Sequence, residues 1–291
     1  MKSSWMLVAA FLFALMGALV KQASLRFSAP ELVFYRSLFG LISIYAVILV
    51  TSRQWLAPLR TRHAFSHAKR GLSGFVALVM FFHAIAHLPL PTAITLNYTS
   101  PLVLAAITGW WLKEAHGRGL VAAVLIGFVG VVLLLRPGWG EQNLMDGLIG
   151  LASGVLAAVA YLNVRTLGRQ GEPDWRVVFY FALMATLGGA VWMFFAGFTV
   201  PAFADWPLLL AMGATATSAQ LAMTRAYRLG NTLAVGALAY ATVGFSALYG
   251  IFLFGDRLPL GAWMGMALIV LAGIIGVWCS KRALPVHPAP E

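Results

Sequence analysis

The feature that most constrains this chain is a series of long apolar segments with almost no charge. Segment 4–20 has no charged residue, segment 32–52 has only Arg36, and segment 71–112 is uncharged throughout. A helix needs about 20 apolar residues to cross the hydrocarbon core of a bilayer. Hydrophobic residues make up 61% of the chain and charged residues 10%, which leaves too little polar surface for a water-soluble protein. The sequence therefore predicts an integral membrane protein.

Ten membrane helices are expected. Segment 71–112 is too long for one crossing, and Leu88-Pro89-Leu90-Pro91 divides it into two helices. The segments are continuously apolar rather than alternating in polarity, which favours an all-α protein over a transmembrane barrel. The remaining apolar segments are 119–135, 147–164, 177–204, 206–224, 232–255 and 258–280.

Basic residues gather on one side of the predicted membrane, which accounts for the net charge of +11. With the N-terminus in the cytoplasm, 15 of the 20 lysines and arginines fall on the cytoplasmic side, whereas the acidic residues show no bias. This pattern is typical of membrane topology rather than of nucleic-acid binding, so we expect no nucleic-acid partner. It predicts a multi-pass protein of the bacterial inner membrane with both termini in the cytoplasm. The exceptions are Lys21, Arg26, Arg36, Arg136 and Arg257.

The two ends of the chain need separate interpretation. Lys2 and the short apolar run after it resemble a secretory signal peptide, whose removal would leave nine helices. Lys21 follows the run directly and no small-residue cleavage site stands out, so we favour a first membrane helix. The single cysteine, Cys279, excludes an internal disulfide. Residues 281–291, which include three prolines, are expected to form a disordered cytoplasmic tail.

The helices fall into two halves of five, 4–135 and 147–280. A shift of 142 residues superimposes several residues of one half on the other. Because five is an odd number, the second half enters the membrane from the opposite side, so the halves form an inverted pair. Inverted repeats are typical of transporters that work by alternating access. The superimposed pairs are Ala84 with Ala226, Tyr98 with Tyr240, Glu114 with Asp256 and Gly119 with Gly261.

Three motifs resemble the EamA-domain family of the drug/metabolite transporter superfamily. They are Pro-Glu-Leu-Val-Phe-Tyr-Arg at 30–36, Ala-Ile-Thr-Leu-Asn-Tyr-Thr-Ser-Pro at 93–101, and 111–119 with its Lys-Glu pair. The second half keeps Gly255-Asp256 but has Val243 where the first half has Pro101. The resemblance implies ten helices in two inverted repeats and a transporter of small solutes. Within the family, the chain is most similar to amino-acid exporters of the YddG type.

Segment 97–101 is the expected docking place for the solute. Pro101 lacks an N–H group and displaces the carbonyl of Asn97, which loosens a helical turn that also contains polar side chains. An unpaired carbonyl and an amide can hydrogen-bond a solute, although Asn97 can equally bond a neighbouring helix. The substrate-binding candidates are Asn97, Tyr98, Ser100, Pro101, Tyr240, His83, Asn163 and Gln220, with weaker support for Tyr161, Trp5, Trp192 and Arg225.

Three ionisable residues lie within the apolar segments. His83 and His87 are four residues apart on one helix face, but without a nearby carboxylate they make a weak metal site. His83 is the better candidate for a proton relay. Arg36 is expected to have a structural role, reaching the outer surface or pairing with Glu31 or another internal acceptor. We expect every Asp and Glu to lie in a connection or at a helix end, so no carboxylate is predicted inside the membrane.

The connections are too short to form a soluble domain, and no nucleotide-binding loop or metalloprotease helix occurs. We therefore expect no enzymatic activity, no cofactor and no metal. The expected partners are a small-molecule substrate and the lipid bilayer, with the chain a monomer or weak dimer. The predicted function is export of amino acids, including aromatic and other neutral ones, or of related metabolites. The alternatives are efflux of drugs or cations, a channel, a membrane-embedded enzyme acting on lipids, or a scaffold.

Overall fold

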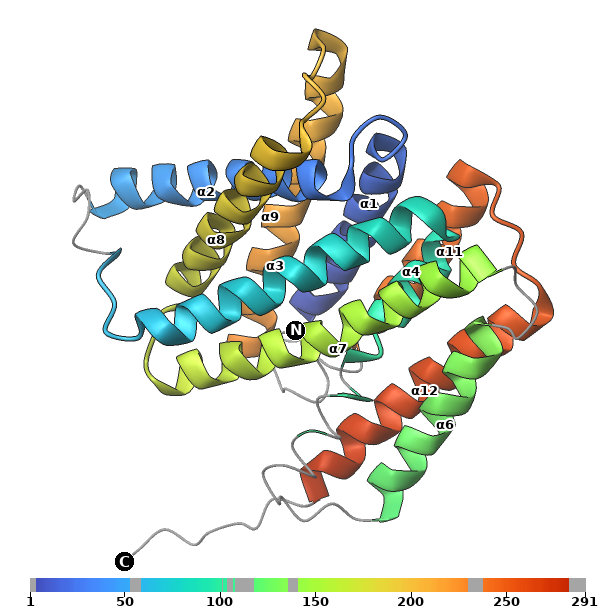
Figure 1. Cartoon of the computed structure of the whole chain (residues 1–291). Coiled ribbons are helices and arrows are strands. Elements are labelled where there is room, and N and C mark those ends of the chain that lie inside the picture. Colours follow the sequence, from blue (N-terminus) through green and yellow to red (C-terminus); the bar gives the residue numbers. More distant parts are fainter. Residues whose placement is uncertain are drawn as a thin grey trace, which may run out of the picture.

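The computed structural model describes residues 4–52, 59–100, 102–103, 107, 118–135, 141–229 and 238–282, and their regular secondary structure is helical (Figure 1). The prediction of an all-α protein is confirmed. The helices are α1 (Trp5–Ala23), α2 (Ala29–Ser52), α3 (Ala64–His87), α4 (Leu90–Asn97), α6 (Arg118–Leu135), α7 (Glu141–Arg169), α8 (Asp174–Ala196), α9 (Trp206–Leu229), α11 (Ala241–Phe254) and α12 (Leu260–Arg282), with a short 3-10 helix η3 (Phe203–Asp205).

Within the described ranges, α1, α2, α3, α7 and α8 are long and apolar enough to cross a membrane. Several helix boundaries differ from those expected. α7 begins at Glu141 rather than at residue 147, and α12 continues to Arg282, two residues into the predicted tail. Charged residues are therefore included in the ends of helices whose centres are apolar. Residues 283–291 lie outside the described part of the chain.

The pairs of helices that pack together stay nearly the same when the two halves of the chain are exchanged. Under such an exchange α1 replaces α7, α2 replaces α8, α3 replaces α9, α4 replaces α11 and α6 replaces α12. The partner pairs α2–α8, α4–α11 and α6–α12 each pack against one another. The contact of α3 with α7 has its counterpart in α1 with α9, and that of α1 with α11 in α4 with α7. This pattern supports, as a proposal, a division into inverted repeats at 4–135 and 147–280.

Two close helix approaches depend on glycine. α6 and α12 run side by side (Figure 1), and a Cβ atom at Gly130 would lie 2.9 Å from the backbone oxygen of Gly265. On α7, a Cβ at Gly154 would lie 2.8 Å from the backbone oxygen of Leu96 at the end of α4. Small residues permit such contacts, which supply much of the packing between membrane helices.

The turn between α3 and α4 is held by one charged group from each half of the chain, Lys21 of α1 and Asp256 of the second half. α3 ends at His87 and α4 begins at Leu90, at the division that the two prolines predict. The Asp256 carboxylate accepts a hydrogen bond from the Leu90 N–H at 2.9 Å, and the Lys21 ammonium donates to the Leu88 carbonyl at 2.8 Å. Lys21 and Asp256 also lie 3.6 Å apart as an ion pair. These bonds satisfy backbone groups that the break between two helices leaves without helical partners.

A second set of charged contacts surrounds Glu172, in the connection between α7 and α8. Gly171, at φ 79°, ends α7, and the Glu172 N–H bonds the Leu167 carbonyl as in a Schellman motif. The Glu172 carboxylate then accepts hydrogen bonds from Thr61 and from Arg176. Burial alone would raise the pKa of Glu172, but these hydrogen bonds and the Arg176 charge outweigh it and lower the pKa below its usual value.

Because the folded-state pKa of Glu172 is depressed, its ionised form stabilises the fold above the unfolded-state pKa of about 4.3. That stabilisation is lost as the pH falls from there through the folded-state pKa. We expect Glu172→Gln to lower the unfolding midpoint in detergent by about 3 °C at pH 7. The difference from the unsubstituted protein should shrink below about pH 4.3. A difference that stays constant down to pH 3 would contradict this role.

Candidate substrate cavity

A cavity lies between the two halves, and eight helices contribute to its wall. Its space, open mouth included, is about 740 Å³. The contributing helices are α1, α2, α3 and α4 from the first half and α7, α8, α9 and α11 from the second. Its polar lining consists of Arg36, Arg70, Asn97, Tyr98, Tyr161, Gln220 and Thr242, and its aromatic lining also includes Phe13, Phe81 and Phe181.

One wall is formed where α4 ends. Regular helix stops at Asn97, and the Thr99 hydroxyl donates back to the Leu96 carbonyl at 2.7 Å. The Asn97 amide donates to the Ser153 hydroxyl of α7 at 3.0 Å, so this side chain both lines the cavity and joins two helices. Ser100 is buried but does not line the cavity. Pro101 lies outside the described residues.

The two tyrosines that the internal repeat superimposes lie in contact. The rings of Tyr98 and Tyr240 are 6.3 Å apart between centroids, in an edge-on arrangement. Tyr98 lines the cavity, and its hydroxyl hydrogen-bonds Thr242 at 2.9 Å. Tyr240 is buried and packs against α12, where the absence of a side chain on Gly273 makes room for its hydroxyl. It therefore supports Tyr98 without lining the cavity.

Of the predicted alternatives for Arg36, the structure shows pairing with an internal acceptor rather than with Glu31 or the outer surface. Its side chain is 7% exposed, lines the cavity and donates to the Gln220 amide oxygen at 3.1 Å. The Glu31 carboxylate instead accepts hydrogen bonds from Ser28 and from the Thr199 N–H. Glu31 thus serves the start of α2, whereas Arg36 is directed into the protein, where Gln220 from the other half meets it.

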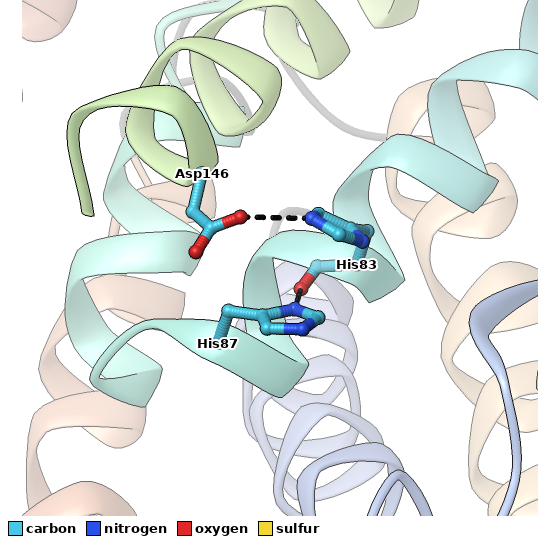
Figure 2. A group of neighbouring side chains, drawn as sticks. All are labelled: His83, His87 and Asp146. Atoms are coloured by element: carbon cyan, nitrogen blue, oxygen red, sulfur yellow. Dashed lines mark hydrogen bonds and ion pairs between the residues drawn. The ribbon is translucent and has the colours of Figure 1, made fainter. Parts of the chain in front are cut away.

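His83 lies away from the cavity, in a group with His87 and Asp146 (Figure 2). Its Nε2 atom is 2.9 Å from the Asp146 carboxylate, and its ring stacks on that of His87 with centroids 4.2 Å apart. Asp146 is buried in the second turn of α7, so it lies at a helix end, as predicted. It is nevertheless part of the helix, because α7 begins at Glu141 rather than at the predicted residue 147.

This group also has the composition of a metal site. One ligand atom from each of His83, His87 and Asp146 lies within 4.8 Å of the others. The His87 Nδ1 atom bonds the His83 carbonyl at 2.8 Å and carries the proton there, so its Nε2 is the nitrogen that can ligate (Figure 2). Two imidazoles and a carboxylate are ligands that zinc accepts.

The remaining candidates are spread over the bundle. Asn163 donates to the Val159 carbonyl of its own helix and does not line the cavity. Tyr161 does line it. Trp5 and Arg225 stack on each other at 4.8 Å, and Trp192 is half exposed on α8. Of the predicted set, the structure brings Asn97, Tyr98 and Gln220 together in one cavity.

Arg70 is a residue of the cavity wall that the sequence analysis does not single out. It was assigned to a cytoplasmic connection because it precedes the uncharged segment that begins at Gly71. α3 in fact begins at Ala64, and Arg70 lies buried in it, lining the cavity. Within α3, Phe65 and Lys69 are exposed and Arg70 is buried, a difference that the structure shows and the hydrophobic pattern of the sequence does not.

Comparison with known proteins gives a consistent picture. Residues 2–136 match the EamA-like transporter family. A pseudopaline exporter, CntI, of Pseudomonas aeruginosa is 31% identical, over 94% of this chain and 95% of its own. A riboflavin transporter of Vibrio cholerae is 28% identical, over 96% of this chain and 94% of its own. A solved crystal structure has the same fold. The match covers 97% of this chain and all of that chain, with a TM-score of 0.67 at 20% sequence identity.

The packing of α7 on the end of α4 predicts a sharp dependence on Gly154. A Cβ atom there would lie 2.8 Å from the Leu96 carbonyl and 3.1 Å from that of Asn97, and backbone cannot move aside as a flexible side chain can. We expect Gly154→Ala to cut solute flux at least about tenfold, or to lower the yield of folded protein. Gly168→Ala, on the same helix with open space around it, is the matched control. Equal flux in both variants would contradict this packing.

Proposed function

The chain belongs to the EamA-like transporter family, within the drug/metabolite transporter superfamily, and from this premise we propose that it exports amino acids or related small metabolites. Its membership makes it a multi-pass membrane transporter of a small metabolite. The relatives named above are transporters of pseudopaline and of riboflavin. Amino acids as the class of solute and export as the direction of transport are our proposal.

The observation that carries the proposal is the cavity between the halves. It receives side chains from four helices of each half, so any relative movement of the halves changes its shape. Sites at the interface of inverted repeats suit alternating access, because exchanging the conformations of the halves moves the opening from one side to the other. The symmetric helix pairs described above support such a movement.

The lining of the cavity suits an amino acid. Asn97 and Gln220 offer amides from opposite halves, and Tyr98 and Thr242 offer hydroxyls. These groups can bind the ammonium and carboxylate of an amino acid, while the aromatic rings pack against its side chain. A few directed polar groups on a mainly apolar wall are typical of small-molecule sites.

In the topology we propose, both termini lie in the cytoplasm, so Lys21 and Asp256 lie at the outer face and Glu172 at the inner face. The inner-face contacts join the α2–α3 connection to the start of α8. The outer-face contacts join the α3–α4 turn to α1 and to the α11–α12 turn. Each end of the bundle thus has its own set of polar contacts that a change of access has to break.

Efflux from proteoliposomes tests the proposal, with amino acids, a nucleoside and a cationic drug each loaded separately, with and without a pH gradient. We expect saturable efflux of one or more amino acids. Efflux of the cationic drug alone would support the drug-effluxer alternative. If none of these solutes moves, the proposed function is wrong.

Asn97→Ala, which removes an amide from the cavity wall, should lower that efflux about tenfold, the effect of losing one buried polar contact. The matched control is Asn163→Ala, which removes an amide that donates to the Val159 carbonyl of its own helix and does not line the cavity. Equal efflux in both variants would remove Asn97 from the site. Loss of efflux in the control alone would point to a different path through the bundle.

A further inference from the structure

Two arginines occupy one side of the cavity, and nothing in the established family membership assigns them a role. Arg36 of α2 and Arg70 of α3 are 7% and 6% exposed. Both lie over the same ring, with the guanidinium carbons 6.0 and 4.2 Å from the centroid of Phe181. Neither takes part in an ion pair within the described part of the chain, and no acidic residue there lines the cavity. Two positive charges thus share a site without a counter-charge from the described residues.

The hydrogen bonds of this pair are incomplete. Arg36 donates from Nη2 to Gln220, but its Nε has no partner among the described residues. Arg70 has neither an Nε nor an Nη1 partner there. A guanidinium carries five N–H donors and keeps its charge in proteins, so buried donors without acceptors destabilise the fold. Contact with the face of Phe181 offsets only part of this, since cation–π contacts contribute about 0.5–2 kcal/mol.

The fold keeps space for the Arg70 guanidinium. Gly74 follows Arg70 by one helical turn, and a Cβ atom there would lie 2.1 Å from Nη1 of Arg70 and 2.9 Å from the Phe181 ring. The side chain therefore runs along its own helix, between α3 and Phe181 of α8. The alternative is a purely structural pair that joins helices. In that case the donors would be expected to bond carbonyl or amide oxygens of neighbouring helices, yet among the described residues Gln220 provides the one such bond.

We infer that Arg36 and Arg70 form an anion-binding subsite of the cavity, which holds the carboxylate of the transported solute. Two guanidinium groups at one place match the oxygens of a carboxylate, which they bind through paired, charge-assisted hydrogen bonds. The rest of the cavity is apolar and aromatic with isolated amides and hydroxyls, so a second anion has no place there. The solute class is then an organic acid or amino acid with a charged end and an uncharged body. Cationic solutes are excluded by repulsion.

This inference rests on the proposed function for its physiological meaning, but binding tests it separately. The test uses purified full-length protein in detergent and a matched pair of probes, 3-phenylpropanoate and 3-phenylpropanamide, which share a ring and differ in charge. Binding to the unsubstituted protein should be at least about tenfold tighter for the carboxylate than for the amide. Inorganic phosphate in a third arm tells an organic carboxylate from a free oxyanion. Phosphate that binds as tightly as the carboxylate would overturn the assignment to an organic acid.

Substitutions test whether Arg36 and Arg70 cause the preference for the carboxylate over the amide. Arg36→Gln and Arg70→Gln should each bring the affinity ratio of carboxylate to amide close to one, with amide affinity unchanged. Arg70→Lys keeps the positive charge but lacks the paired N–H donors of a guanidinium, so it should give an intermediate affinity ratio of carboxylate to amide. Arg26→Gln removes an exposed arginine that pairs with Asp205, outside the cavity, and should leave the ratio unchanged. A ratio that survives in both glutamine variants would overturn the inference.

If the glutamine variants do not fold, Gly74→Ala shifts the Arg70 guanidinium without removing its charge and should also lower the ratio, with Gly168→Ala as control. Failures of the two proposals are distinguishable. Efflux of an amino acid that both arginine variants leave unchanged would overturn the subsite while the transport function stands. An arginine-dependent preference for the carboxylate, with no efflux of any solute, would support the subsite and overturn the proposed function.

Discussion

The structure depends on the requirement that backbone polar groups inside a bilayer find partners within the protein. Continuous helices meet it directly. Where helical bonding stops, the structure supplies other groups: Lys21 and Asp256 bond the backbone between α3 and α4. At the end of α4, the chain packs closely on α7 because Gly154 has no side chain. The second of these places adjoins the cavity, where Asn97 becomes available to a solute. The backbone at the interruption therefore has to be shielded from lipid by the rest of the protein. The same interruption lies beside the cavity.

The packing of the helices in pairs places the cavity between the two halves. Each half contributes four helices to its wall, whereas α6 and α12 pack on one another outside it. Charge then distinguishes the side chains around it. Arg36 and Gln220 meet across the halves, and Arg70 lies on the same aromatic ring as Arg36. Charged residues are tolerated at membrane depth where they face a cavity instead of lipid. The carboxylate of a bound solute would thus supply the counter-charge that the described residues do not give the two arginines.

The sequence predicts what depends on local chain chemistry. The prolines between residues 88 and 91 place the α3–α4 turn correctly, whereas of the two superimposed tyrosines, both candidates for binding the substrate, only Tyr98 lines the cavity. Arg70 and Asp146 were placed outside their helices for one shared reason. Helices were delimited by the absence of charge, so charged residues of a cavity or of a helix–helix contact were assigned to connections. The direction in which Tyr240 points depends on Gly273 in another helix, which no local pattern reveals.

The most direct test of a cavity that opens alternately to both sides is reactivity of one cysteine within it. Ala157→Cys places a thiol on the cavity wall, in a chain whose single native cysteine is replaced by Cys279→Ser. A membrane-impermeant thiol reagent should label it from either side in oriented vesicles, block efflux, and react several-fold more slowly when transported solute is present. Labelling that no solute slows, or efflux that survives complete labelling, would contradict a solute path through this cavity.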